Sequence, residues 1–268
     1  EKSFGGISMG EEEKKLGIKG SSTRQVFFND CEVPVQNMLS ERQNGFKIAV
    51  NILNIGRVKL GAGVLGGCRT VTSQAIQYAN ERKQFGTSIS SFGAIKGKLA
   101  EMATRIFVTE SLDYRAGQNI EDKIDELIAD GMDDNQAKLK GVEQFAIECA
   151  ISKIHSSEVL DYVVDEGVQV YGGMGFSQDA PMERAYRDSR IARIYEGTNE
   201  INRMLMVGML LKRAMKGELD IYGPAMDVSK ELTSVPTFST IDKSVLFAEE
   251  KEVIKNLKKV FLMVAGKA

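Results

Sequence analysis

The chain has 268 residues, of which 43% are hydrophobic and 27% charged, and its formal net charge at pH 7 is −2. This composition is typical of a globular protein long enough for one large core or two domains. The near-neutral charge excludes the broad basic surface of a protein that binds nucleic acid. No apolar run approaches the roughly 18–20 residues of a membrane span.

The cysteine and histidine content argues against metal and histidine chemistry. Cys31, Cys68 and Cys149 are far apart and form no CxxC pair, which predicts reduced structural thiols. His155 is the only histidine, which argues against a histidine metal site and a Ser-His-Asp triad. We therefore expect no metal site.

The first 35 residues are rich in glycine and turn-forming residues. Residues 25–28 and 31–35 have the composition of short strands. The chain begins at Glu1 inside this pattern, so we interpret it as a fragment.

From about residue 44, apolar residues recur at helical spacing. We expect the acidic segment 119–135 to form a solvated excursion between helices. Long helices with inward apolar stripes predict a mainly α fold, an antiparallel four-helix bundle preceded by a short β remnant. The expected helices cover about 44–79, 94–118, 136–170 and 199–216.

The sequence also suggests domain boundaries. Residues 1–35 form the β remnant, and 36–220 form the helical domain. Residues 221–268 begin an extra extension, polar at first and helical again over 245–265.

The most informative motif is Ile-Tyr-Glu-Gly-Thr-Asn-Glu at residues 194–200. Glu196 lies at a boundary between a polar segment and a new apolar helix, beside the ring of Tyr195. A carboxylate at such a corner, with limited access to water, can be tuned as a general base. The alternative is an ordinary exposed glutamate at a helix boundary.

A second motif closes the third predicted helix. Residues 169–176 read Gln-Val-Tyr-Gly-Gly-Met-Gly-Phe, which alone indicates only a glycine-rich helix end. Its continuation through Asp179, Arg184 and Asp188 keeps a specific spacing. With that continuation, the stretch resembles the second signature of the acyl-CoA dehydrogenases.

Other segments agree with this family in order and spacing. Residues 81–86 resemble its Arg-x-x-Phe-Gly element, and residues 194–200 resemble its catalytic segment. Residues 15–34 resemble the end of its middle β domain. The resemblance covers about residues 1–215.

The resemblance implies oxidation of the Cα–Cβ bond of an acyl-CoA thioester. In the family, a carboxylate removes the α proton while the β hydrogen leaves as hydride to FAD. Some members place this carboxylate on the helix that contains Gly56, next to the arginine that Arg57 matches. A glycine cannot be that base, which favours Glu196. The missing side chain at Gly56 would leave room for a long acyl chain, the alternative being helix packing. The resemblance assigns the base to Glu196 and substrate contacts to Asn54, Arg57, Tyr195 and Gly197.

The resemblance also implies an FAD site shared across a homodimer. Arg82 would pair with the pyrophosphate of the neighbouring subunit's FAD, the alternative being a solvated cation at a helix end. Thr198 would contact the flavin, the alternative being a helix N-cap. The implied FAD contacts are Arg82, Gln84 and Phe85, then Gln169, Gly172 and Gly173 at the adenosine end, and Thr198 and Glu200 after the base.

Residues 91–93 and the tail beyond 220 are most similar to the very-long-chain branch. This implies a long-chain acyl-CoA substrate and electron-transfer flavoprotein as a partner. It also implies a location in the bacterial cytoplasm or the eukaryotic mitochondrial matrix, without secretion. The tail of that branch can associate with membranes, but residues 221–268 show no clear membrane-binding face, so membrane association stays open.

Alternatives of other kinds remain. A non-catalytic assembly or scaffold protein could use the same fold, because fold alone does not determine function. An acyl-CoA oxidase would pass its electrons to oxygen. The fragment by itself is expected to be inactive, because one wall of the flavin site would be missing.

Overall fold

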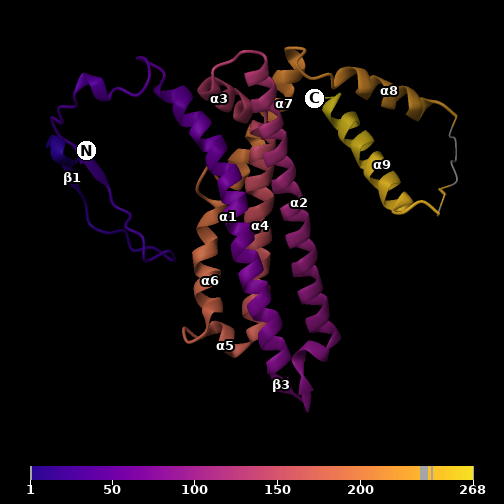
Figure 1. Cartoon of the computed structure of the whole chain (residues 1–268). Helices are drawn as coiled ribbons and strands as arrows, with labels where there is room; N and C mark the ends of the chain where they lie inside the picture. The colour runs from indigo at the N-terminus through magenta and orange to yellow at the C-terminus, as the bar shows by residue number, and fades with distance from the viewer. Residues whose placement is uncertain (1, 236–240, 243, 268) are drawn as a thin grey trace. The chain divides into compact units, whose positions relative to one another are not determined.

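The computed structural model describes residues 2–235, 241–242 and 244–267. The chain divides into two compact units, Glu1–Met204 and Leu205–Ala268 (Figure 1). The domain boundaries expected from the sequence stay predictions.

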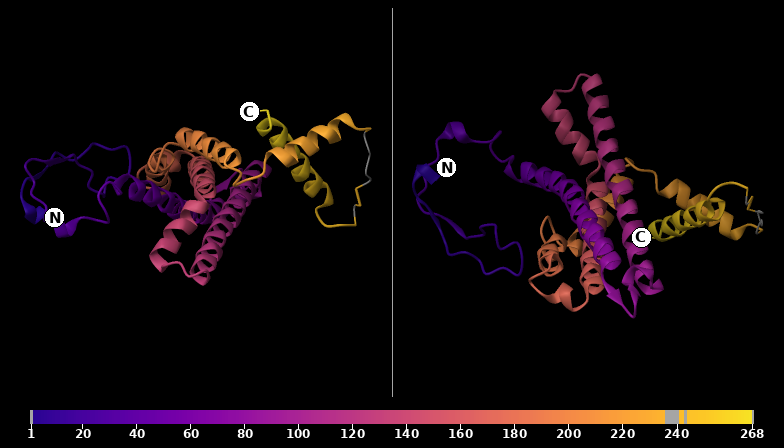
Figure 2. Two further views of the ribbon diagram at one scale, coloured as in Figure 1. Left: turned by 90° about the horizontal axis from the view of Figure 1, so that it is seen from above. Right: turned by 60° about the horizontal axis from the view of Figure 1, so that its bottom comes forward.

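Long helices build the first unit. Its three longest helices run up and down in alternation (Figure 1), and they lie side by side in the further views of Figure 2. This confirms a mainly α, antiparallel helix bundle. The helices are α1 (Gly45–Glu81), α2 (Gly93–Ala129), α3 (Asp134–Gln144), α4 (Ala146–Tyr171), α5 (Gly173–Phe176), α6 (Pro181–Ser189) and the first turn of α7 (Asn199–Met215), with 3₁₀ turns at Lys2–Phe4, Val35–Asn37, Ile89–Ser91 and Arg190–Arg193.

The core lies where α1, α2 and α4 meet. Small side chains such as Cys68 and Ala75 are fully buried, and they let the helices approach closely around Met102 and Val163. The sequence did not predict α6, which packs along α4 through the fully buried Met182. The predicted helix 136–170 is broken at Phe145 into α3 and α4.

The expected excursion at residues 119–135 was wrong. Helix α2 continues to Ala129 because Ile120 and Ile124 stay on its buried stripe and pack against Ala137 and Cys149. The acidic residues occupy the other faces of the same helix, so high charge density here marks a solvated helix face and not a loop.

Replacing Ile124 with Ala tests this packing. The change should lower the free energy of unfolding by about 2–5 kcal/mol, because it leaves a cavity in a tightly packed contact. Ile128, on the same helix, is 41% exposed. Its replacement with Ala is the control and should cost far less. Equal shifts in the urea midpoint for the two variants would contradict the buried continuation of α2.

The strands differ from the expected pattern. β1 (Ile7–Met9) pairs antiparallel with β2 (Val26–Phe28), with Ile7 opposite Phe28. The expected strand at 31–35 is absent, and a 3₁₀ turn begins at Val35 instead.

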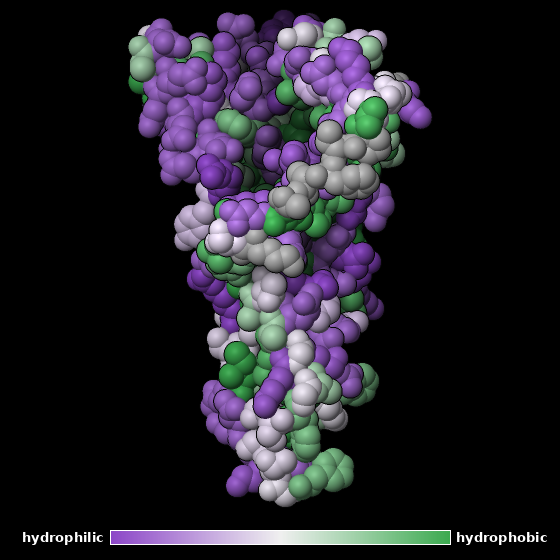
Figure 3. Space-filling view, turned by 90° about the vertical axis from the view of Figure 1, so that its right-hand side faces the viewer, coloured by the Kyte–Doolittle hydropathy of each residue, from purple (hydrophilic) through white to green (hydrophobic). Residues whose placement is uncertain are grey.

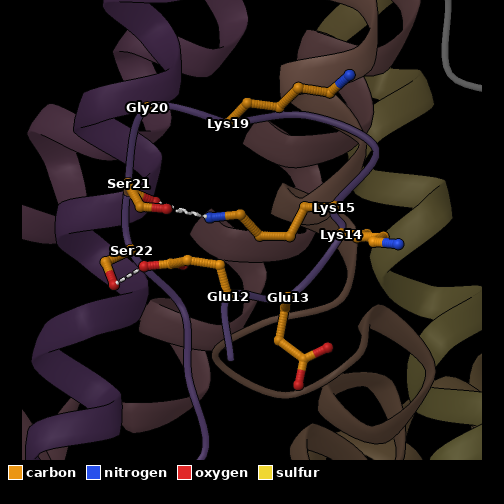
Figure 4. A pocket seen from close by; sticks show the side chains of 8 residues that line it. All are labelled: Glu12, Glu13, Lys14, Lys15, Lys19, Gly20, Ser21 and Ser22. Atoms are coloured by element: carbon orange, nitrogen blue, oxygen red, sulfur yellow. Dashed lines mark hydrogen bonds between the residues drawn. The ribbon is translucent and has the colours of Figure 1, made fainter. Parts of the chain in front are cut away.

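The loop between β1 and β2 encloses a small hollow lined by charged side chains (Figure 4). Lys15 Nζ donates to the carbonyl oxygen of Ser21 at 2.6 Å, and Glu12 accepts from Ser22. This hollow contains none of the predicted site residues.

Among the described residues, α1 alone is long and apolar enough to cross a membrane by length and composition. The sequence did not predict this, because polar residues such as Asn54 and Arg57 interrupt the apolar run of α1. Its inner face is core, however, and includes buried polar residues such as Asn51 and Asn54. The core helix of a bundle passes the same test as a membrane span.

The second unit contains the rest of α7, with α8 (Tyr222–Thr233) and α9 (Ala248–Ala265). Lys259 pairs with Glu231, and these two residues link α9 to α8. Apolar residues of α9 such as Leu257 and Phe261 are exposed. The face shown in Figure 3 is mainly hydrophilic with scattered hydrophobic patches. Membrane association therefore stays open.

Candidate active site

Glu196 lies in a tight turn between the 3₁₀ turn Arg190–Arg193 and α7. Its φ is +58° and that of Gly197 is +84°, so two consecutive residues are in the left-handed region. A non-glycine residue there costs about 1–3 kcal/mol, and such strain is concentrated at functional sites. The turn therefore holds Glu196 in a conformation that the residue would not adopt by itself.

The Glu196 carboxylate lies against Gly56 of α1. A Cβ atom added to Gly56 would lie 2.6–2.8 Å from the three carboxyl atoms of Glu196. One carboxylate oxygen, Oε2, is buried and has no hydrogen-bond partner. A buried, unpartnered carboxylate oxygen is suited to accept a proton from a ligand. This geometry does not fit the alternative of an exposed glutamate at a helix boundary.

Side chains from three helices hold the carbonyl oxygens of this turn. Lys153 of α4 donates from Nζ to the carbonyl of Gly197 at 2.8 Å. Arg57 of α1 donates from Nε to the carbonyl of Glu196 at 3.2 Å. Asn202 of α7 donates from Nδ2 to the carbonyls of residues 196–198, at 3.3, 2.8 and 3.2 Å.

Sequence reasoning missed Lys153, Asn199 and Asn202. Lys153 also donates to Oδ1 of Asn199 at 2.6 Å. The signal was available in the spacing, because Lys153 falls four residues after the buried Cys149 and seven before Leu160, on the apolar stripe of α4. A lysine on such a stripe needs partners, and the turn supplies them.

Two buried cations therefore flank the turn. Lys153 is fully buried and Arg57 is 6% exposed. Burial, together with the neighbouring Arg57, lowers the pKa of Lys153 to about 8. Burial also lowers the pKa of Arg57, although Cys149 and Glu196 act in the opposite direction.

The predicted substrate residues lie around this turn. Arg57 donates to Oδ1 of the buried Asn54 at 2.9 Å, so both side chains are engaged inside the bundle. Tyr195 is 45% exposed, and partial burial raises the pKa of its phenol, with a contribution from Glu196. The acyl-CoA contacts of these residues stay predictions.

Thr198 and Glu200 follow the base directly. Thr198 Oγ1 accepts from the backbone N–H of Ile201 at 3.3 Å, so the N-cap role exists. Hydrogen bonds from its own backbone N–H and from Thr198 lower the pKa of the exposed Glu200. Their flavin contacts stay predictions.

Most of the other predicted FAD residues share a second region, at the far end of α1. A hollow of about 710 Å³ is lined by Arg82 and Gln84, which directly follow α1, and by Gly172 and Gly173, which directly follow α4. Gln169 is exposed nearby on α4, outside the lining. The stacked rings of Tyr78 and Tyr171, with centroids 4.0 Å apart, also border the hollow.

Phe85 is at the tip of the hairpin formed by β3 (Lys83–Gln84) and β4 (Thr87–Ser88). Its φ is +52° and that of Gly86 is +82°, which fits a tight type I′ hairpin turn. The ring is 93% exposed. A strained, fully exposed aromatic side chain suggests a contact with another molecule.

Glu196 and the Arg82 hollow are far apart. Arg82 follows Gly56 by 26 residues at the end of α1, and a rise of about 1.5 Å per residue separates the two by about 39 Å. The residues expected to contact the flavin and those expected to contact the pyrophosphate therefore lie in separate regions of one subunit.

Comparisons with known proteins identify the family of this chain. The family profile "Acyl-CoA dehydrogenase, C-terminal domain" matches residues 43–211. A probable acyl-CoA dehydrogenase of Bacillus subtilis is 45% identical over the whole chain, which covers 45% of that protein. The very long-chain specific acyl-CoA dehydrogenase of rat mitochondria is 41% identical over 88% of the chain and 31% of its own length.

Solved structures are also similar. An acyl-CoA dehydrogenase from Bacillus anthracis, complexed with FAD, matches with a TM-score of 0.93 and 44% identity, over 99% of this chain and 45% of that one. Butyryl-CoA dehydrogenase from Megasphaera elsdenii matches with a TM-score of 0.67 and 36% identity, over 79% and 50%. The chain thus spans at most about half the length of these relatives. It belongs to the acyl-CoA dehydrogenase family and includes the helical C-terminal domain of that family.

Proposed function

We propose that this chain is part of an FAD-dependent acyl-CoA dehydrogenase acting on long-chain thioesters, with Glu196 as the base that removes the α proton. The observation that carries the proposal is the Glu196 carboxylate, held by a left-handed turn with a buried, unpartnered oxygen over Gly56. The FAD would accept the β hydrogen as hydride. A scaffold protein would have no need of a carboxylate held in this way.

The residues of the second hollow fit a dinucleotide. The exposed Arg82 offers a guanidinium that can pair with pyrophosphate. The backbone at Gly172 and Gly173 is open, since a Cβ atom at either position would meet nothing within 4 Å. Because this hollow lies about 39 Å from Gly56, we infer a homodimer in which it holds the FAD of the neighbouring subunit.

The visible spectrum of the whole, FAD-loaded protein tests the function. Palmitoyl-CoA should bleach the flavin, and electron-transfer flavoprotein should then restore its colour. Bleaching by butyryl-CoA alone would retain the dehydrogenase and overturn the long-chain preference. Rapid recolouring by oxygen would favour an oxidase, and no bleaching by either thioester would favour the scaffold alternative.

Replacing Arg82 with Ala tests the shared cofactor site. The variant should retain FAD about 10- to 100-fold more weakly, because one hydrogen-bonding charged group contributes about 1.5–3 kcal/mol. Its apo form should melt like the wild type, because Arg82 is exposed. Lys83→Ala in the same hairpin is the control. Normal flavin content after dialysis, with collapse of the apo protein, would make Arg82 a structural residue.

We also propose a reducing compartment, the bacterial cytoplasm or the mitochondrial matrix. Cys31, Cys68 and Cys149 are all free thiols. Because the chain spans less than half of its Bacillus relatives, we expect residues 1–268 alone to turn over no substrate.

A further inference from the structure

The turn at residues 196–198 directs three consecutive carbonyl oxygens toward side-chain donors inside the bundle. In a trans peptide the N–H points opposite to the carbonyl of the same unit. Donors that hold the carbonyls of Glu196 and Gly197 therefore also set the direction of the next N–H groups. They determine the orientation of the backbone from which the Glu196 side chain extends.

Lys153 differs from the other two donors in its chemistry. It is a fully buried ammonium, and both of its hydrogen-bond acceptors, the Gly197 carbonyl and Asn199 Oδ1, belong to this segment. An apolar residue at such a position is often as stable as a buried charge. A lysine on the apolar stripe of α4 is therefore better explained by orientation of the turn than by stability of the bundle.

We propose that Lys153 is a positioning residue for the base. The Lys153 ammonium donates to the Gly197 carbonyl and to Asn199. These bonds keep Glu196 in the left-handed conformation that places the Glu196 carboxylate against Gly56 of α1. The inference rests on the proposed function, because the role of Glu196 as a base is itself part of that proposal.

The hydrogen bonds from Lys153 to the turn should depend on pH, because charged groups and burial determine the protonation of Lys153. Arg57 faces it from α1, Glu158 from α4, and Glu196 and Glu200 from the turn and α7. On the α2 side, Asp113 is hydrogen-bonded to Ser152 and Ser156. With the pKa of Lys153 lowered to about 8 by burial, the ammonium predominates at neutral pH and is lost progressively as the pH rises through 8. The hold on the turn should weaken over the same range.

Replacing Lys153 with Met in the whole, FAD-loaded enzyme tests the proposal. The variant should lose about 100-fold in kcat, because small displacements of a reacting group have effects of that size. Its flavin content and its Kd for acyl-CoA should stay within a few-fold of the wild type. Lys98→Met is the matched control, since Lys98 ties α2 to Glu166 of α4 away from the turn. It should leave kcat unchanged.

A second readout does not depend on activity. In the apo protein, amide hydrogen exchange at residues 196–202 should be faster in Lys153→Met than in the wild type and in Lys98→Met. Retention of more than a third of wild-type kcat, or unchanged exchange at the turn, would overturn the proposal. If the wild type itself oxidises no acyl-CoA while exchange at the turn rises in the variant, the proposed function fails, and only the hold of Lys153 on the turn stands.

The pH profile gives a further test if Lys153→Met does not fold. Wild-type kcat/KM should fall above an apparent pKa near 8, with faster exchange at the turn after correction for its intrinsic pH dependence. Lys153→Arg keeps a permanent cation, so it should restore part of the activity and lack this alkaline decline. A wild-type profile that is level from pH 7 to 10 would overturn the proposal.

Discussion

Replacing Glu196 with Gln in the whole protein should lower kcat by about 10²–10⁴-fold or more, because general-base catalysis alone contributes that much. The amide has nearly the same shape as the carboxylate, so it should still rest on Gly56. Flavin content and acyl-CoA binding should therefore be unchanged. Stopped-flow measurement of flavin reduction reports the chemical step directly.

Glu200→Gln is the matched control for this variant. Glu200 lies four residues later and is exposed. Its replacement keeps a polar side chain at the predicted flavin contact and should change kcat little. If Glu196→Gln retained more than a tenth of wild-type turnover, the base would have to be another residue.

Replacing Gly56 with Ala should lower kcat by about 10- to 100-fold, the effect expected when a catalytic group is displaced by about 1 Å. The new Cβ would lie 2.6–2.8 Å from the Glu196 carboxylate, closer than contact distance. The carboxylate would have to move away from α1. The urea midpoint should change little, because the atoms that must move are the end of the Glu196 side chain and not backbone or packed core.

Gly63→Ala, in the same helix, separates the contact from helix propensity. A Cβ atom at Gly63 meets nothing within 4 Å. This variant should be more stable by about 0.4–1 kcal/mol, because alanine reduces the entropy of the unfolded chain. Its turnover should be unchanged. Equal behaviour of the two variants would mean that Gly56 does not determine the placement of the Glu196 carboxylate.

The sequence by itself determined the family of this protein and the identity of its candidate base. The motifs at residues 81–86, 169–176 and 194–200 are local, and their spacing can be read without a fold. The long helices were also predictable, because a repeated apolar stripe reports burial of one helix face.

Only the tertiary structure decided how these segments meet. Helix α6 and the pairing of β1 with β2 depend on contacts between distant residues, which local patterns do not encode. The continuation of α2 beyond residue 119 depended on Ile120 and Ile124 finding α3 and α4, despite the high local charge.

The same limit applied to the candidate site. The position of Gly56 under the Glu196 carboxylate joins residues that are far apart in the chain. In the sequence, Lys153 is one polar residue within a helix. Only the structure shows that its ammonium donates to the carbonyl of Gly197 in the turn. A motif determines which residue types are present. The direction of each side chain is set by long-range packing and by the hydrogen bonds that a buried charge requires.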